Sequence, residues 1–403
     1  MAGVILRGSL WLAIWLCLLC ARSASGAVEN VGVVSSADGE SLQKASRGDV
    51  VRLELLKDRV HLPHVAVKIE GAAGPQFLLS DRPEYFLTGN GIALQEEVKA
   101  GMVRLYIYHV PEPMGGKKVI TAVIENLAAK SMSLRFLRSA FPAPGTDYQR
   151  IAKEGLERFL SCEPEKNAKT ILPGRITVLD SQMDATAVTK DQLVHGFYEF
   201  EIDQPARVSV LQRDPDEVSG EVVKVLPKLP QVLPGKKNGN GAGRGLFPTC
   251  DFTVTNEAVI DTVNGPMQLM VADGKRDGWI RGRDGIENND TRNAGNYGVM
   301  YRIRLTRASS DGRGLALLLC NLNARSQWCG RLGAAMRVSD GVFPAGVVRL
   351  PSERAVFGEA EEGALIQKFP PLKKGETSTI ELVYSPPGAA CIPTPLVFIP
   401  YQP

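Results

Sequence analysis

The chain has 403 residues, of which 47 are Lys or Arg and 44 are Asp or Glu, so its formal net charge at pH 7 is +3. A balance this close to neutral produces no long-range field for polyanions, which argues against nucleic acid and anionic membranes as partners. The length predicts two or three domains.

Residues 1–27 have the pattern of a secretory signal peptide. Arg7 precedes an apolar run over residues 10–20, and the small residues Ser25 and Ala27 follow it. The run has 11 residues, whereas a membrane-spanning helix needs about 20. We therefore predict cleavage near residue 27 and a secreted or cell-surface location, with an uncleaved anchor as the alternative. Cleavage removes two arginines and no acid, which leaves 45 basic and 44 acidic residues, and no later segment is long and apolar enough to span a bilayer.

Alternation of apolar and polar residues dominates the next hundred residues. The segments VVRLELL, VAVKIEG, MVRLYIYHV and KKVITAVIEN all have a period of two and are separated by Gly- and Pro-rich turns. Short strands at this spacing, without helices between them, are typical of a β-sandwich. We predict an N-terminal sandwich domain over residues 28–145, in which VITAVIEN and SMSLRFL form an antiparallel hairpin through LAAK.

A helix is expected immediately after this domain. In TDYQRIAKEGLERFL, Thr146 or Asp147 can cap the N-terminus, and apolar residues then recur at helical spacing from Tyr148 to Leu160. We interpret this apolar stripe as packing between domains. Strand patterns resume in RITVLD, GFYEFEID and ARVSVLQ, so residues 146–225 should contain the helix and further strands.

Residues 226–249 are the best candidate for a linker. Prolines dominate the first half and glycines the second, so we expect a stiff extended part followed by a flexible part. Residues 250–403 again carry strand patterns and form a predicted C-terminal β-rich domain. The predicted fold class is all-β, with two or more β-sandwich-like domains and one amphipathic helix between them.

Five cysteines lie after the signal segment: Cys162, Cys250, Cys320, Cys329 and Cys391. An odd number in an exported protein implies at least one unpaired thiol or a link to another chain. Cys320 and Cys329 flank NLNARSQW, so they are candidates for a disulfide that closes a short loop between adjacent strands. The alternative is that all five are buried thiols.

The stretch DGKRDGWIRGRDGIENND, residues 273–290, is rich in Asp and Gly, as calcium-binding loops are. The EF-hand pattern fails at its third position, where Lys275 stands instead of an oxygen ligand. A nonstandard calcium site remains as a hypothesis, and no other cofactor is expected. The alternative, which we favour, is a series of Asp-Gly turns on the surface with Trp279 beneath them. The candidate calcium ligands are Asp284, Glu287 and Asp290.

Candidate ligand-binding residues are aromatic. Trp279 and Trp328 are the two tryptophans that remain after the signal segment, and Trp328 follows the NLNARSQ segment as a loop candidate. Exposed rings of this kind suit carbohydrate stacking, although burial is the commoner fate of an aromatic side chain. No hydrolase motif is recognisable, but a glycosidase needs only two suitably spaced acids, and the sequence does not single out such a pair.

Two stretches resemble a group of exported bacterial proteins. They are VLDSQMDATAVTKDQLVHGFYEFEIDQPARVSVLQRDP, and NAGNYGVMYRIRLTR with the following LLLCNLN. Both resemble secreted proteins of spore-forming and related bacteria that are largely uncharacterised and sometimes carry copper-amine-oxidase-like N-terminal modules. The resemblance implies an extracellular or envelope role and transfers no active-site residue. The chain shows no histidine cluster of the kind that copper chemistry requires.

The leading functional hypothesis is an exported cell-surface or extracellular binding protein without catalytic activity. Its ligand would be a cell-wall polymer, a glycan or another protein. One alternative is a carbohydrate-active hydrolase with an acid pair that the sequence does not reveal. Another is a structural envelope component that assembles through an odd cysteine or exposed strand edges.

Overall fold

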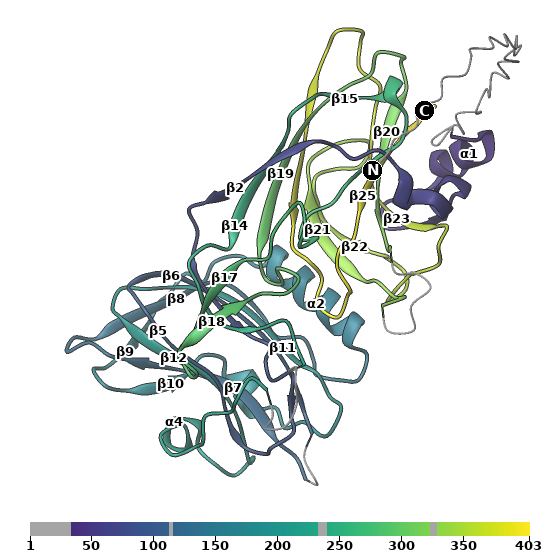
Figure 1. Ribbon diagram of the computed structural model, residues 1–403. Helices are drawn as coiled ribbons and strands as arrows, with labels where there is room; N and C mark the ends of the chain where they lie inside the picture. Colours follow the sequence, from purple (N-terminus) through teal and green to yellow (C-terminus); the bar gives the residue numbers. More distant parts are fainter. Residues whose placement is uncertain (1–33, 113–115, 233–239, 323–328) are drawn as a thin grey trace, which may run out of the picture. The chain divides into compact units, whose positions relative to one another are not determined.

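The alternating segments form β-strands, which the computed structural model assembles into four sheets (Figure 1). The structure describes residues 34–112, 116–232, 240–322 and 329–403, and these belong to a single compact unit. The predicted signal peptide and Trp328 lie outside the described residues. The predicted all-β fold with sandwich-like pairs of sheets is confirmed. In the described part of the chain, no helix is long and apolar enough to cross a membrane.

The first pair of sheets contains most strands between residues 76 and 292. Leu105 and Tyr198 from the larger sheet pack against Ile124 and Val210 from the smaller one in a shared buried cluster. The smaller sheet has the order β10 (Ile176–Val178), β7 (Val119–Asn126), β12 (Ala206–Arg213), β5 (Gly91–Val98). The larger has the order β18 (Asn289–Arg292), β17 (Arg281–Asp284), β13 (Arg244–Phe247), β3 (Gln76–Ser80), β6 (Gly101–Pro111), β11 (Val194–Ile202), β8 (Met132–Ala140), β9 (Lys169–Ile171), with β4 (Tyr85–Phe86) beside β6.

The second pair contains the C-terminal strands together with two strands from the start of the chain. Its core includes Leu317 and Ile366 from one sheet and Ile303 and Leu382 from the other. One sheet has the order β1 (Val50–Arg52), β23 (Glu362–Phe369), β20 (Gly314–Cys320), β25 (Leu396–Tyr401), β16 (Met267–Leu269). The other has the order β2 (Val67–Ala72), β14 (Asp251–Asn256), β19 (Met300–Ala308), β24 (Ser378–Tyr384), β21 (Ala334–Val338), β22 (Gly346–Leu350), with β15 (Ile260–Asp261) beside β19.

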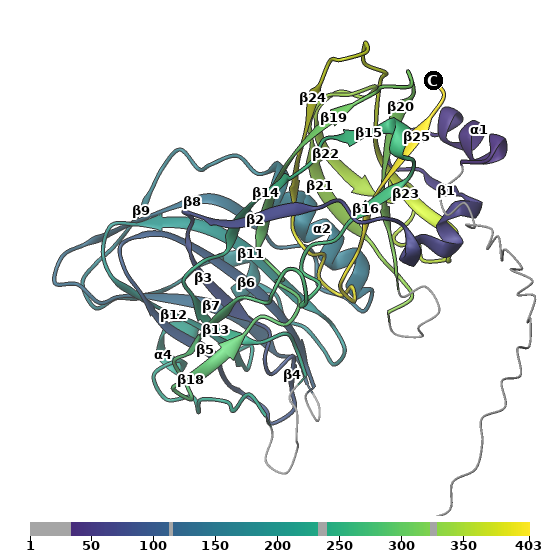
Figure 2. The ribbon, with the colours of Figure 1, turned by 45° about the horizontal axis from the view of Figure 1, so that its top comes forward.

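The segment at the start of the described chain covers the outer face of the β23–β20–β25 sheet (Figures 1 and 2). Its helix α1 (Ser36–Lys44) and 3₁₀ segment η1 (Glu54–His61) place Leu42 and Leu56 against Leu318. At the end of α1, the buried Lys368 ammonium donates to three backbone carbonyls, at 2.8–3.2 Å. A cation at a helix C-terminus satisfies orphan carbonyls and complements the helix dipole, so it fixes α1 to β23.

The predicted helix is present as α2 (Tyr148–Ser161), and its apolar stripe is buried as expected. The Asp147 carboxylate accepts the Arg150 N–H and caps the first turn. Phe159 stacks on Phe197 of β11 with ring centroids 3.7 Å apart. The same helix also contacts β21 and β22 of the C-terminal sheets, so its stripe links the two pairs of sheets. Three shorter helices are α3 (Ser181–Ala185), α4 (Ser219–Val222) and η2 (Thr262–Asn264).

The predicted hairpin between VITAVIEN and SMSLRFL is wrong. The first segment is β7, which pairs with β10 and β12, whereas the second is β8, which pairs with β11 and β9 in the opposite sheet. β8 alternates between buried and half-buried residues, whereas β7 is buried on both faces, and one face of each strand meets the other in the sandwich core. The LAAK connection therefore crosses between sheets, a choice that short-range patterning does not specify.

Residues 244–247, expected to be part of a flexible linker, instead form a strand of the larger sandwich sheet. Arg244–Phe247 forms β13, which pairs with β3. A Cβ at Gly243 would lie 2.2 Å from the Arg292 carbonyl oxygen, and one at Gly245 would lie 2.2 Å from the Arg283 carbonyl oxygen. Both glycines also have positive φ angles. Glycine is therefore needed here for close approach of neighbouring backbone.

Sheet membership also crosses the expected domain boundaries. Strands β1 and β2 come from the first predicted domain but pair with C-terminal strands. Strands β17 and β18 come from the predicted C-terminal domain but extend a sheet of the first pair. Each pair of sheets is therefore assembled from segments that are far apart in the sequence.

Candidate functional site

The first half of the 273–290 stretch is a structural turn. The Asp273 carboxylate accepts three successive backbone N–H groups, from Lys275, Arg276 and Asp277, at 2.8–2.9 Å. The buried Asp277 carboxylate accepts the Tyr301 hydroxyl at 2.5 Å. These acids therefore satisfy local donors, as Asp does in tight turns.

The second half forms the β17–β18 hairpin, and its candidate calcium ligands have other partners. Asp284 is fully buried and pairs with the fully buried Arg244 guanidinium at 2.9 Å. Glu287 lies 3.5 Å from the same guanidinium and accepts the Gln231 backbone N–H. Asp290 projects into solvent, 3.8 Å from Arg283.

The donor set does not fit calcium. Arg244 takes the position that a cation would need between Asp284 and Glu287. Among the described residues, no three His, Cys, Asp or Glu side chains are placed to hold a metal ion together. Calcium prefers six to eight oxygen ligands, and a guanidinium in their midst opposes it. The hairpin is instead organised around a buried ion pair.

A third carboxylate adjoins this ion pair. Glu96 of β5 is buried, and its carboxylate accepts the Gly285 N–H at 2.6 Å. Burial, reinforced by the nearby Asp284 charge, raises the pKa of Glu96 to about 7 despite the opposing Gly285 N–H and Arg244. The hairpin is therefore joined to the opposite sheet by a contact whose charge changes near neutral pH.

Trp279 lies beside the turn and is half-buried. The Arg292 guanidinium lies over its ring, 5.1 Å from the centroid, and a Cβ at Gly274 would lie 2.8 Å from a ring carbon. This packing agrees with the interpretation of the stretch as turns, which placed Trp279 beneath them. Its predicted ligand contact stays a prediction, as does that of Trp328, which is outside the described residues.

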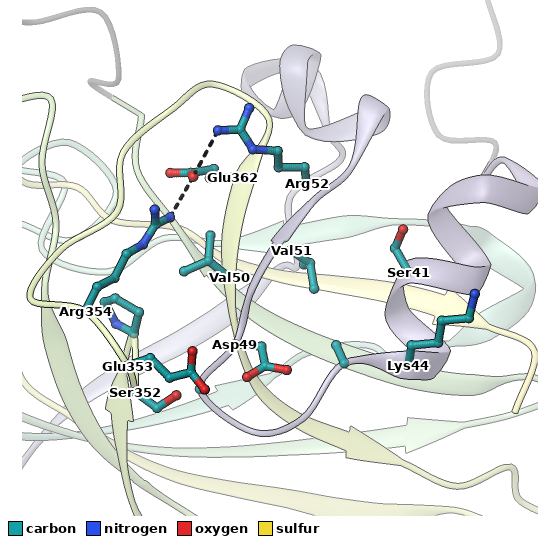
Figure 3. A pocket seen from close by; sticks show the side chains of 13 residues that line it. Ser41, Lys44, Asp49, Val50, Val51, Arg52, Ser352, Glu353, Arg354 and Glu362 are labelled. Atoms are coloured by element: carbon teal, nitrogen blue, oxygen red, sulfur yellow. Dashed lines mark hydrogen bonds and ion pairs between the residues drawn. The ribbon is translucent and has the colours of Figure 1, made fainter.

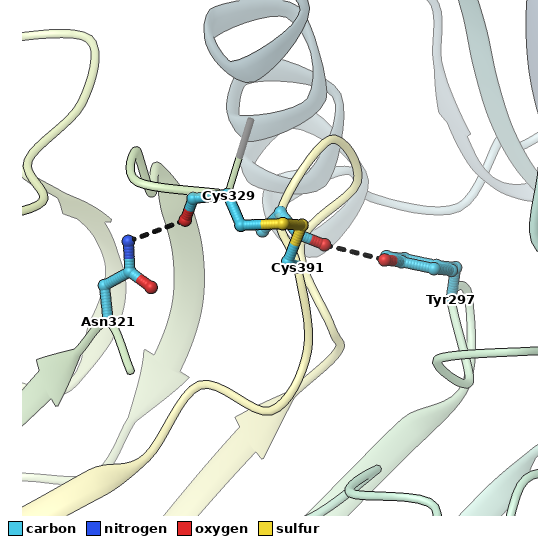
Figure 4. Close-up of a disulfide and its surroundings, with 5 residues drawn as sticks. Tyr297, Asn321, Cys329 and Cys391 are labelled. Carbon is cyan, nitrogen blue, oxygen red and sulfur yellow. Dashed lines mark hydrogen bonds between the residues drawn. A yellow bond between two sulfur atoms is a disulfide. The ribbon is translucent and has the colours of Figure 1, made fainter. Parts of the chain in front are cut away.

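The predicted disulfide between Cys320 and Cys329 is wrong, because Cys329 is bonded to Cys391 (Figure 4). Cys320 is a buried thiol in the last position of β20, packed in the cluster beneath α1. The bond joins the loop before β21 to the loop before β25. Beside it, the Tyr297 hydroxyl donates to the Ala390 carbonyl at 2.6 Å. Cys162 and Cys250 are also unpaired, so an odd thiol is present as expected.

An open groove of about 820 Å³ is lined in part by the β17–β18 hairpin, and we name it the Met102 groove. It crosses the ends of five neighbouring strands, β18, β17, β13, β3 and β6. Its apolar floor comes from Met102, Leu246 and Pro248, whereas the adjoining Phe247 side chain is fully buried. Met102 is 44% exposed, which is unusual for a large apolar side chain in a strand. The groove lies within the size range of small-ligand sites.

Polar groups line the sides of the Met102 groove. They are contributed by Gln76, Lys99, Arg281, Arg283 and Asp290. Gln76 is fixed, because its side-chain amide exchanges two hydrogen bonds of 2.8 Å with the Lys99 backbone. Arg283 is held by the Asn288 side chain at 2.6 Å and by Asp290. Three cations face one carboxylate, so the groove carries an excess of positive charge.

Unlike Arg283, Arg281 has a side chain without a hydrogen-bond or ion-pair partner in the described part of the chain, and it is exposed. Its cross-strand neighbour is Arg292, whose guanidinium stacks on Trp279. An unpaired guanidinium on a fixed strand offers up to five N–H donors to an anionic ligand.

The sequence identified only part of this groove. Asp290 was a candidate, but as a metal ligand, while Met102 and Lys99 carried no recognisable signal. Met102 follows a Lys-Ala-Gly turn, but the spacing of apolar residues does not show that this side chain is exposed at a groove. What brings these residues together is the addition of β13, β17 and β18 to the edge of the β3–β6 sheet.

Comparison with known proteins gives no family assignment. No protein-family model matches the chain, and no curated protein matches it. Among solved structures, the protein YhaK from Escherichia coli aligns with 83% of this chain and 94% of its own, at 11% sequence identity and a TM-score of 0.13. A structural likeness at that score carries no argument about fold or function.

Proposed function

We propose that this protein is an exported binding protein without catalytic activity, and that it holds an extended acidic glycan or wall polymer in the Met102 groove. The single observation that carries the proposal is the groove itself, with its apolar floor and its excess of positive charge. The signal-like N-terminus and the Cys329–Cys391 disulfide support action outside the cytoplasm, because disulfides persist mainly in oxidising compartments.

The geometry suits a polymer because the groove spans several strands and is open to solvent. The floor side chains can cover the apolar faces of sugar rings, while guanidinium and ammonium groups pair with carboxylates or phosphates. Most groove residues sit on paired strands, and the side chains of Gln76 and Arg283 are already held by hydrogen bonds, so these two need little reordering when a ligand binds. Preorganisation of this kind lowers the entropic cost of association.

The test is affinity electrophoresis of the purified protein through gels that contain one polymer each. Polygalacturonate supplies carboxylates, a glycerol-phosphate wall polymer supplies phosphates, and dextran is the neutral control. We expect retardation by at least one acidic polymer and none by dextran. Comparing the two acidic gels distinguishes the two sources of negative charge.

Variants then locate the interaction. The R281S/K99S double variant should lose about tenfold or more in affinity and show a weaker dependence on salt. K373S, which removes an exposed cation outside the groove, is the matched control and should bind like the wild type. Equal retardation by dextran, no retardation at all, or full retention by the double variant would each refute the proposal.

A further inference from the structure

A second pocket of about 820 Å³ lies between the start of the described chain and the turn that follows β22 (Figure 3). We name it the Arg354 pocket. One wall is the segment from the end of α1 through β1, and the other is the turn at residues 351–354. On the β1 wall, Val50 supplies half-buried apolar surface (Figure 3), whereas Val51 is buried in the cluster beneath α1. The pocket is lined by different residues from the Met102 groove.

Backbone hydrogen bonds hold the two walls together. The Ser352 N–H donates to the Gly48 carbonyl at 2.8 Å, and the Gly48 N–H donates to the Leu365 carbonyl of β23 at 2.8 Å. The approach is close, because a Cβ at Gly48 would lie 2.6 Å from the Ser352 Cβ. Beneath the turn, the buried Lys153 ammonium donates to the carbonyls of Pro351 and Arg354, both at 2.9 Å. The pocket is therefore a fixed feature of the fold.

One end of the pocket presents two guanidinium groups that are held by a buried carboxylate. Glu362 is 3% exposed, and its carboxylate accepts the backbone N–H groups of Gly358 and Glu359. The Arg354 guanidinium binds this carboxylate at 2.6 Å, and Arg52 approaches it at 3.5 Å from the other side (Figure 3). Arg52 is shared with other glutamates, whereas Glu362 is the one ion-pair partner of Arg354 in the described structure. Half of the Arg354 side chain stays exposed, with further N–H donors for a ligand.

The other end presents two carboxylates, and the Lys44 ammonium on the α1 wall is paired with Glu40 at 3.7 Å. The carboxylates of Asp49 and Glu353 lie on opposite walls near the Ser352 hydroxyl (Figure 3). Asp49 accepts the Ser46 N–H at 2.7 Å through one oxygen, which leaves the second oxygen for a ligand. Glu353 is exposed and makes no hydrogen bond or ion pair within the described residues. This pair of acids suits a cationic group such as an ammonium.

We propose that the Arg354 pocket binds a zwitterionic ligand of the size of a short peptide, with its carboxylate on Arg354 and its ammonium on Glu353 and Asp49. The apolar floor at Val50 accommodates a small aliphatic side chain between the two charges. The half-exposed Arg354 guanidinium at one end and the carboxylates of Asp49 and Glu353 at the other favour a ligand that carries both charges. This site goes beyond the proposed polymer binding and does not depend on it.

The test is isothermal titration of the purified protein with the dipeptide Ala-Ala, its N-acetyl derivative and its C-terminal amide. We expect Ala-Ala to bind, and each blocked form to bind about tenfold or more weakly, because each has lost one of its two charges. R354Q should abolish the preference for Ala-Ala over its amide while keeping the preference over the N-acetyl form. E353Q should show the reverse pattern.

This crossed pattern separates ligand recognition from a general loss of structure. E376Q, in an exposed turn, is the matched control and should behave like the wild type. Absence of binding by Ala-Ala, equal binding of all three peptides, or variants that lose no discrimination would overturn the proposal. R281S/K99S, which changes the Met102 groove, should bind Ala-Ala like the wild type. The two sites are therefore tested separately, and a negative result in the polymer-binding test would not affect the conclusion about the Arg354 pocket.

Discussion

Breaking the buried ion pair between Arg244 and Asp284 should cost the folded protein several kcal/mol, because it leaves a buried charge without its partner. Both side chains are fully buried, with nitrogen and oxygen 2.9 Å apart. At an effective dielectric constant near 20, this separation corresponds to an attraction of about 6 kcal/mol, part of which offsets the cost of burial. D284N leaves the guanidinium buried with carbonyl acceptors from Ala93 and Leu229 and a weaker contact to Glu287. We expect this variant to lose about 3–4 kcal/mol of unfolding free energy.

The assay is urea unfolding at pH 7, followed by tryptophan fluorescence and by far-ultraviolet circular dichroism. The variants are D284N, R244M and the double variant R244M/D284N. Because the second substitution removes a charge that has already lost its partner, the double variant should be little less stable than either single variant. The double-mutant cycle should therefore give a coupling energy of about 2–3 kcal/mol. E221Q, which breaks the exposed pair with Lys224, should cost less than about 0.5 kcal/mol.

Additive effects of the two single variants would refute the reasoning. So would a loss below about 1 kcal/mol for D284N, because an uncompensated buried guanidinium should cost more than that. Either result would mean that water or a moved carboxylate compensates Arg244 in solution. The hairpin would then be held mainly by its backbone pairing with β13.

Three further predictions follow from other contacts. Replacing Cys329 and Cys391 by Ala opens a loop with a sequence separation of 62 and should lower the unfolding free energy by about 4 kcal/mol, measured in urea. Gly245→Ala places a Cβ against a neighbouring carbonyl and should cost about 3 kcal/mol, whereas Gly312→Ala, with nothing within 4 Å, should cost about 1 kcal/mol. Burial raises the folded-state pKa of Glu96 to about 7, above the ordinary glutamate value of 4.5, so the unfolded chain releases this proton first as the pH rises. The free energy of unfolding should therefore fall as the pH rises from 4.5 to 7. Unfolding curves measured over this pH range should show a smaller fall for E96Q, because the variant has no carboxyl group that titrates at this position.

Local patterns in the sequence were sufficient for several elements. The helix at Tyr148–Ser161 was predictable because its cap, Asp147, and its apolar spacing all lie within one short segment. Strands such as β6 and β19 were predictable from alternation for the same reason. The turn interpretation of residues 273–277 also relied on local chemistry, since Asp273 binds donors two to four residues away.

The groove and the charged networks were not predictable in this way. Arg244 looked like part of a flexible linker, yet it pairs with Asp284, 40 residues along the chain. Asp290 looked like a metal ligand because sequence shows its charge but not the arginine across the strand. Cys329 bonds to Cys391 because packing, and not sequence proximity, places their sulfurs together.

The sequence by itself therefore determined the kinds of elements: strands by a period of two, and one long helix by its cap and its 3.6-residue stripe. Only the tertiary structure decided that β7 and β8 face each other across a core, that a glycine-rich segment becomes β13, and which charges line the Met102 groove. The physical reason is that periodicity is a property of neighbouring residues. Strand order, register and ion pairing depend instead on close packing between segments that can be more than 150 residues apart, as β3 and β13 are.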